Sequence, residues 1–480
     1  MGTTNNLPDN YMFDVISDVI KNTDFNTGNE ETENKLIINR EAMESVKSAF
    51  IKYAVNIKIK HYDKVISMLW KQLNIPIQLT ESIMKEIILE YIHFLQDIST
   101  YAGLNNAYVY SEYIHAAVNI VYNVAPQNNN EFTVPMAIPG NYGNIELNKI
   151  VNSIGIGSLE QLDNFFPLKI VEKKIKVKYP NPYVKALTEV YIKGQNGIKQ
   201  QFGNRAIMES MAYLIEKKIT HGAGAAPDFP YSSAEMVVNL TYPEFGSDQL
   251  NIIALCDMSM QFSEPGKVFY HSLIDFKKMQ FLPSKPEDII DYFYNNPCIQ
   301  MGNSINLAIG FTNMAFMVGD RLKEYMKGKE FTPFHNVIHN LLGFAINTRI
   351  NHRYFFINLV RDGYALNNNT LKNTIRIIGT PIIKDSANDF WLVLPFGIKP
   401  ENYNIDIFPA ILEINKLFEN GNDCCEMYDW CQKSLGTTVD ERCMFEPWSR
   451  CHDQKLCPYA LLWRHWNLSQ YIPKVTNQNY

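Results

Sequence analysis

Six of the eight cysteines in this 480-residue chain lie within its last 57 residues. They are Cys424, Cys425, Cys431, Cys443, Cys451 and Cys457, and the last is followed by Pro458. Thiols this close together in a reducing compartment usually hold a metal or a cluster, or pack as small apolar groups. Either use requires the end of the chain to fold back on itself. The sequence therefore predicts a cysteine-rich C-terminal subdomain.

The spacing of these cysteines leaves their chemistry open. Zinc ligands typically come as close pairs, and this tail contains no C-x2-C pair. A Cys-Pro at the last ligand, as at Cys457, occurs in some iron–sulfur sequences. We predict a structural zinc or iron–sulfur site held by Cys431, Cys443, Cys451 and Cys457. Buried free thiols are the first alternative, and disulfide or redox use is the second.

Apolar residues recur at helical spacing over most of the chain. The pattern predicts helices over 80–98 and 107–122, with a turn near Gly103 between them. Further along, it predicts a strand over 170–179, helices over 184–192 and 204–219, and β-like runs over 376–383 and 390–395. The first two helices are joined by a short connection, which is typical of a helical bundle.

Length and composition set the domain organisation. A chain of 480 residues is too long for one ordinary core, and with 46% apolar and 20% charged residues it is globular. We expect a mainly α fold, made of multi-helix bundle domains with a few short β-strands. The predicted segments are a polar N-terminal arm (1–35), a helical bundle (36–123), a loop-rich linker with a basic segment and a buried helix (124–230), a second helical domain (231–365), and short strands with the Cys/Trp-rich tail (366–480).

Two E-Y-I-H segments place a glutamate and a histidine on one helix face, at Glu90 and His93 and again at Glu112 and His115. Carboxylate-bridged di-metal sites in helical bundles use two such motifs from facing helices, with further carboxylates from other helices. Glu209, on a strongly apolar helix, is a candidate for one of these. These five residues are our candidate catalytic ligands of a di-iron or di-manganese site. The alternative is that the stripes face water or hydrogen-bond to each other.

A basic segment interrupts the otherwise mildly acidic chain. Between Lys169 and Arg205 there are nine lysines and arginines, against only Glu172 and Glu189. The whole chain has a net charge of −6, so it lacks the basic surplus that duplex binding normally shows. The segment is either a solvated strand or loop face, or a contact surface for an anion or a nucleic acid.

The sequence carries no signature of secretion, of a membrane span or of a familiar catalytic family. Its start has no positive region followed by an apolar one, and its most membrane-like stretch, 305–318, is too short and too polar to cross a bilayer. We therefore expect a cytoplasmic protein without a membrane partner. No P-loop, G-x-G-x-x-G, G-x-S-x-G or kinase motif is present, so whether the protein is an enzyme stays open.

Three functions compete on this basis, and the sequence alone favours the first over the other two. The first is a soluble intracellular protein that acts through protein–protein contacts, with a partner or a second copy of itself, and has a zinc or iron–sulfur site in its tail. The second is a di-metal enzyme of the oxidase or hydrolase class that uses Glu90, His93, Glu112 and His115. The third is a nucleic-acid or anion binder that uses the segment from Lys169 to Arg205.

Overall fold

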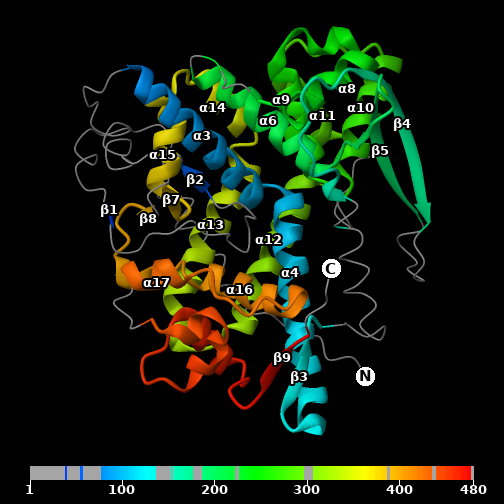
Figure 1. The fold of residues 1–480 in the computed structure, drawn as a ribbon. Coiled ribbons are helices and arrows are strands. Elements are labelled where there is room, and N and C mark those ends of the chain that lie inside the picture. The colour runs from blue at the N-terminus through cyan, green and yellow to red at the C-terminus, as the bar shows by residue number, and fades with distance from the viewer. Residues whose placement is uncertain are drawn as a thin grey trace, which may run out of the picture.

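The computed structural model describes residues 38–39, 55–57, 77–136, 152, 155–176, 186–220, 222, 226–296, 306–385, 390–434 and 439–476. These residues form a mainly helical body, and a sheet of long antiparallel strands lies along one side of it (Figure 1). The mainly α fold predicted from the helical spacing is therefore confirmed.

Helices α3 (Ile77–Ser99) and α4 (Tyr101–Val124) follow each other with a single residue between them. That residue, Thr100, caps α4 by accepting a hydrogen bond from the Gly103 backbone N–H at 3.2 Å. The turn predicted near Gly103 was wrong, because Gly103 lies inside α4. A Cβ atom there would lie 2.1 Å from the carbonyl oxygen of Asp97, so only glycine allows the two helices to join this tightly.

Several helices of the body pack directly on these two. Helix α3 packs against α6 and α13, while α4 packs against α12. The predicted helix over 204–219 is confirmed as α6. The bounds are α6 (Asn204–Ile219), α7 (Asp228–Tyr231), α8 (Ser233–Thr241), α9 (Gln249–Ser259), α10 (Pro265–Lys278), α11 (Pro286–Asn295), α12 (Leu307–Tyr325), α13 (Thr332–Asn351), α14 (Phe355–Arg361), α15 (Asn369–Ile378) and α16 (Ile407–Asn420).

A buried ion pair joins two of these helices. Arg349 on α13 donates to both carboxylate oxygens of Asp257 on α9, at 2.9 and 2.7 Å. Both side chains are almost fully excluded from solvent, and the guanidinium group lies over the rings of Phe311 and Phe356. A buried charge of either sign requires such a partner, so this pair fixes α13 against α9.

Three strands form the sheet at the side of the body. They are β4 (Pro167–Lys176), β5 (Ala186–Gly194) and β6 (Lys199–Gln201), all antiparallel in the order β4-β5-β6. The predicted strand over 170–179 corresponds to β4, but the helix predicted over 184–192 was wrong. Val190 and Ile192 of β5 are buried on one face of the sheet, where β-branched residues favour a strand.

The remaining strands are short. Strands β1 (Ile38–Asn39), β8 (Phe390–Val393), β7 (Ile383–Asp385) and β2 (Val55–Ile57) form a sheet in that order. Most of the β-like run predicted over 376–383 was wrong, because α15 continues to Ile378 and β7 begins only at Ile383. Strand β3 (Glu131–Val134) pairs in parallel with β9 (Ile472–Val475), which ties the end of the chain to the segment after α4.

The cysteine-rich tail folds onto the body through α16. It contains α17 (Tyr428–Ser434), the 3-10 helices η8 (Glu441–Met444) and η9 (Pro447–His452), and α18 (Pro458–His465), which packs on α16. Buried apolar residues of the described part form one cluster that reaches from α3 into this tail. The division into five segments stays a prediction. None of the described helices is both long and apolar enough to cross a membrane.

Candidate functional site

The outer sheet carries three lysines in a single row. Lys169 of β4 pairs with Lys193 of β5, and Lys193 pairs in turn with Lys199 of β6. Directly paired residues point to the same face of an antiparallel sheet, and neighbouring strands lie about 4.8 Å apart. The three side chains therefore leave the same face of the sheet side by side, from backbone positions that span about 10 Å. We call Lys169, Lys193 and Lys199 the lysine row.

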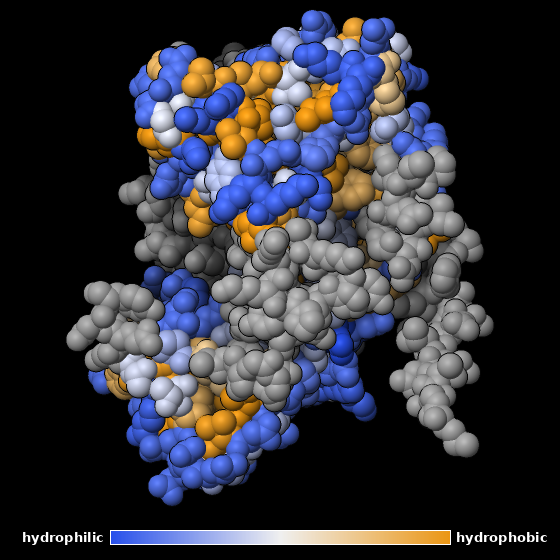
Figure 2. Space-filling view, turned by 90° about the vertical axis from the view of Figure 1, so that its right-hand side faces the viewer, coloured by the Kyte–Doolittle hydropathy of each residue, from blue (hydrophilic) through white to orange (hydrophobic). Residues whose placement is uncertain are grey.

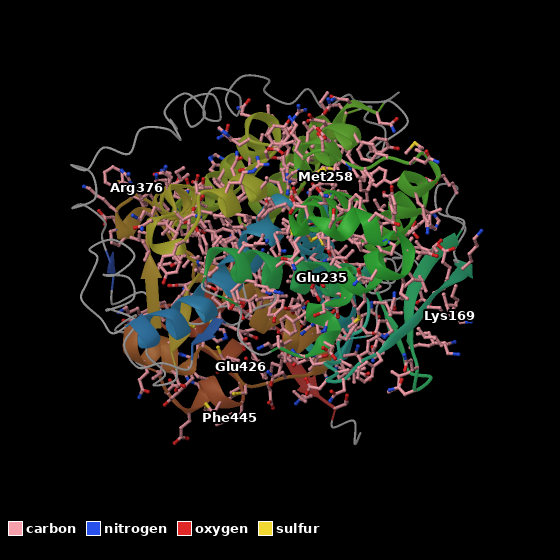
Figure 3. All side chains as sticks on the ribbon, turned by 90° about the horizontal axis from the view of Figure 1, so that it is seen from above. Lys169, Glu235, Met258, Arg376, Glu426 and Phe445 are labelled. Atoms are coloured by element: carbon pink, nitrogen blue, oxygen red, sulfur yellow. The ribbon has the colours of Figure 1, made fainter. Side chains whose placement is uncertain are left out.

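No carboxylate neutralises the lysine row within the described part of the chain. None of its three side chains forms an ion pair or a hydrogen bond with a described residue, although Lys173 on the same face pairs with Glu189 at 3.4 Å. Lys169 and Lys199 are exposed, and Lys169 lies at the outer edge of the molecule (Figure 3). Like charges directly opposite each other destabilise a sheet, so stability of the fold does not account for the lysine row.

An aromatic ring lies beside the row. Tyr191, two residues before Lys193 on the central strand, shares the face of the row and is half-buried. Its hydroxyl donates to Glu189 at 2.7 Å. Burial and the Glu189 carboxylate raise the pKa of Tyr191 to about 12, so the phenol is neutral at physiological pH. The face thus combines cations with a neutral ring whose hydroxyl is fixed by a hydrogen bond.

Three of the five predicted di-metal residues cluster between α3 and α6. Nε2 of His93 lies 3.2 Å from Oε2 of Glu209, and Nδ1 lies 2.9 Å from Oε1 of Gln96. Burial alone would lower the pKa of His93, but the charges of Glu209 and Glu90 and the bond to Glu209 raise it to about 9. His93 is thus an imidazolium at neutral pH, and in that form it offers no lone pair to a metal.

The same contacts hold the two helices together. Gln96 donates through its Nε2 to the Met208 carbonyl at 3.1 Å, and Arg205 lies 3.7 Å from the second carboxylate oxygen of Glu209. Burial alone would raise the pKa of Glu209. The charge and hydrogen bond of His93 and the charge of Arg205 outweigh burial, so the pKa is lowered and the carboxylate stays ionised. The cluster has the geometry of an interhelical ion pair.

The other two predicted residues lie against a different helix. Glu112 of α4 accepts from Nε of Arg321 at 2.8 Å and from the hydroxyl of Tyr325 at 2.9 Å, both on α12. The ring of His115 stacks on Tyr325 with the centroids 4.2 Å apart. The structure therefore brings Glu90, His93 and Glu209 together but places Glu112 and His115 in a separate cluster.

The four cysteines predicted as metal ligands are all buried. The Sγ of Cys443 accepts a hydrogen bond from Nη1 of Arg450 at 3.1 Å. The Sγ of Cys457 accepts one from the backbone N–H of Ala460 at 3.4 Å. The carbonyl oxygen of Cys451 is bound by the guanidinium group of Arg464. Burial raises the pKa of the Cys451 and Cys457 thiols, which keeps them protonated at neutral pH.

Cys425, which the prediction left out, is closely associated with this set. Its backbone N–H donates to the Cys443 carbonyl at 2.9 Å. Burial, then the charges of Glu413, Cys431 and Cys457, raise the pKa of its thiol far above the usual value. Proximity of this kind depends on how the tail folds, and the spacing of the cysteines gave no sign of it.

In the described part of the chain, no group of three or more His, Cys, Asp or Glu side chains is arranged to hold a metal ion. All the described cysteines are free. The zinc, iron–sulfur, di-iron and di-manganese sites therefore stay predictions from the sequence.

Two features of the structure escaped the sequence analysis. The lysines of the row are visible in the sequence, but their alignment depends on the register of three strands. The ion pair between Asp257 and Arg349 joins residues 92 positions apart, and no local pattern links them. No protein-family model matches this sequence, and no curated protein or solved structure is significantly similar to it. Functional inference therefore rests on the chain's own geometry.

Proposed function

We propose that the protein binds single-stranded nucleic acid across the exposed face of the β4-β5-β6 sheet. The observation that carries this proposal is the lysine row, three lysines aligned on one face of the sheet without a described carboxylate partner. Phosphates are the anions that an uncompensated row of lysines suits, because each contact releases a condensed counterion. The charge of the row is local, since the chain as a whole carries −6.

The neighbourhood of the row favours a single strand over a duplex. Single-strand binders combine a cationic track for the backbone with aromatic rings on which bases stack. Tyr191 supplies such a ring two residues from Lys193, and Phe166, just before β4, is 60% exposed. The Phe166 carbonyl accepts from the Gln195 backbone at 2.9 Å, which places it near the end of the row. In a duplex the bases are stacked on each other, so these rings would find no free base face to contact.

The other roles predicted from the sequence are still proposed beside nucleic-acid binding. A protein partner or a second copy of the chain, a cytoplasmic location and a metal in the tail are each compatible with nucleic-acid binding. Pairs of buried charges, as at His93 and Glu209, account for the best-placed residues of the di-metal hypothesis without catalysis. We propose no activity from them.

Binding of a labelled single-stranded oligonucleotide, followed by fluorescence anisotropy at about 50 mM salt, tests the proposal. The triple substitution Lys169→Gln, Lys193→Gln and Lys199→Gln should weaken binding at least tenfold. It should also reduce the slope of log affinity against log salt by about 2, because three phosphate contacts on a single strand are lost. Tyr191→Leu should weaken binding about threefold or more while leaving the slope unchanged.

The matched control removes three exposed lysines from other elements, through Lys327→Gln, Lys329→Gln and Lys399→Gln. It has the same change in net charge and should leave the affinity within about twofold. An equal loss in the control, or no binding by the native protein at low salt, would overturn the proposal. Equal binding of polyglutamate and oligonucleotide would show a general acidic ligand and would also overturn it.

A further inference from the structure

A groove with a volume of about 540 Å³ lies between the start of β4 and the helices α8 and α10. It lies beside the lysine row, because Lys169 belongs to both. Figure 2 views the molecule from the side on which β4 lies in Figure 1, and the described part of this face mixes hydrophobic with hydrophilic residues. The volume falls in the range of ligand-binding clefts.

Helix α10 builds one wall because a second stripe with apolar residues lies beside the one that it buries in the core. The first stripe, Phe269, Leu273 and Phe276, is fully buried in the core. The neighbouring stripe, with Tyr270, Ile274 and Lys277 at positions i, i+4 and i+7, lines the groove and is only partly covered. An amphipathic helix needs one apolar stripe to pack on its own body, so the second stripe is available to something else.

Apolar side chains from the other walls are left exposed. Leu168 at the start of β4 is 52% exposed and Leu240 near the end of α8 is 37% exposed, and both line the groove. Ile170 of β4 and Ile274 of α10 also line the groove and are only partly buried. Single exposed apolar residues are ordinary, but a set that converges on one concave surface marks an interaction site.

The charged groups of the groove are all cations. Lys169, Lys277 and Lys278 line it, and no described carboxylate does. Lys277 donates to the Thr241 carbonyl at 2.8 Å, which neutralises no charge. Lys278 lies 3.2 Å from Asp275, but both are well exposed, so their pairing is weak.

We propose that this groove docks an acidic amphipathic segment of a protein partner. Such a segment would place its apolar face between Ile274 and Leu168 and its carboxylates near Lys169, Lys277 and Lys278, in the manner of a helix bound in a groove. Charge complementarity selects an acidic segment, and the apolar lining from Leu168, Leu240 and Ile274 is surface that a small anion would leave uncovered. A concave surface also fits a polypeptide better than a flat bilayer.

This site does not depend on nucleic-acid binding, and its test uses a designed probe. The probe is a labelled peptide of about 15 residues with leucines at helical spacing and glutamates on the opposite face. Its counterparts are the same peptide with lysines in place of the glutamates, and a scrambled peptide of the original composition. The native protein should bind the acidic amphipathic peptide at least tenfold more tightly than either counterpart in fluorescence anisotropy.

Substitutions in the groove test whether the peptide binds there. Leu168→Glu, at an exposed position, should weaken binding about tenfold or more, and so should Lys277→Glu combined with Lys278→Glu. Ile309→Glu on α12 changes an equally exposed apolar residue far along the chain and should have no effect. Lys327→Glu combined with Lys329→Glu is the matched charge reversal and should leave the affinity within about twofold.

The outcomes separate this site from the nucleic-acid surface. Leu168→Gln removes the apolar side chain without adding a charge beside Lys169, so it should weaken peptide binding but leave oligonucleotide binding within about twofold. Lys193→Gln should leave peptide binding within the same margin. Equal binding of the acidic and scrambled peptides, or no effect of the groove substitutions, would overturn the docking site. Binding of vesicles that contain an anionic lipid, without binding of the peptide, would assign the groove to a lipid surface and overturn it as well.

Discussion

Charged residues of the helical body and of the outer sheet follow opposite rules. In the body, the cation Arg349 is held by both oxygens of Asp257, and the imidazolium of His93 is held by Glu209. On the sheet, Lys169, Lys193 and Lys199 lie in one row without a described carboxylate to neutralise them. Each of these two body cations has a partner from another helix. Each lysine of the row instead has a neighbour of the same sign.

This difference separates structural charges from charges that are free to bind a ligand. A buried ion that loses its partner destabilises the fold strongly, so selection for folding alone explains the pairs in the body. An exposed row of like charges slightly destabilises the sheet that carries it, so folding does not explain the lysine row. Removal of a charge should therefore destabilise the protein in the first region and stabilise it in the second.

Arg349→Met should have the largest effect. It leaves Asp257 as an uncompensated buried carboxylate, and the free energy of unfolding should fall by about 3–5 kcal/mol. Urea unfolding followed by circular dichroism measures this change. The double substitution Arg349→Met with Asp257→Leu removes both charges and should recover much of the loss. If the double variant were no more stable than Arg349→Met, the pairing would not be the cause.

Glu209→Gln should have the next largest effect. It removes the charge that keeps His93 protonated in the interior, and the free energy of unfolding at neutral pH should fall by about 2–3 kcal/mol. Arg205→Met is the matched control, because its guanidinium is 3.7 Å from Glu209 and partly exposed, so its loss should cost less than about 1 kcal/mol.

The pH dependence of this pair has a definite sign. The pKa of His93 is about 9 in the folded protein and near 6.5 when unfolded, so its contribution is complete below 6.5 and is lost as the pH rises through 9. The difference in stability between the native protein and Glu209→Gln should therefore narrow over this interval. A difference that stayed constant from pH 6.5 to 9 would contradict an ionised His93.

Sequence reasoning succeeded where structure is decided locally. Helix α6 was predicted with its observed bounds, because its apolar periodicity is complete within sixteen residues. Strand β5 was assigned to a helix, because its state depends on pairing with β4 and β6 and on burial of Val190 and Ile192 against the body. Periodicity showed that Glu and His share a face in each E-Y-I-H segment, but it could not show that the two segments face α6 and α12.

For the candidate sites, too, local sequence showed which residues are present but not how the fold arranges them. The basic segment was recognisable from composition, yet its useful property, the alignment of Lys169, Lys193 and Lys199, comes only from strand register. The groove beside β4 combines residues from β4, α8 and α10, which span more than 100 positions of the sequence. No local pattern encodes a surface assembled from three such elements.

The smallest expected change in the free energy of unfolding belongs to Lys193→Gln. It is the only one of these changes that should stabilise the protein, so it tests the comparison most directly. Lys193 is the central member of the row, with a lysine on each side, so Lys193→Gln should raise the free energy of unfolding by about 0.2–0.5 kcal/mol at low salt. The gain should shrink at about 0.15 M salt, where repulsion is screened. Lys173→Gln on the same face is the matched control, because Lys173 pairs with Glu189 and its removal should give no gain. The urea midpoints of unfolding of both variants, compared with that of the native protein, measure these changes. If Lys193→Gln destabilised the protein as much as Lys173→Gln, the row would be compensated like the charges of the body, and the case for a ligand on this face would fail.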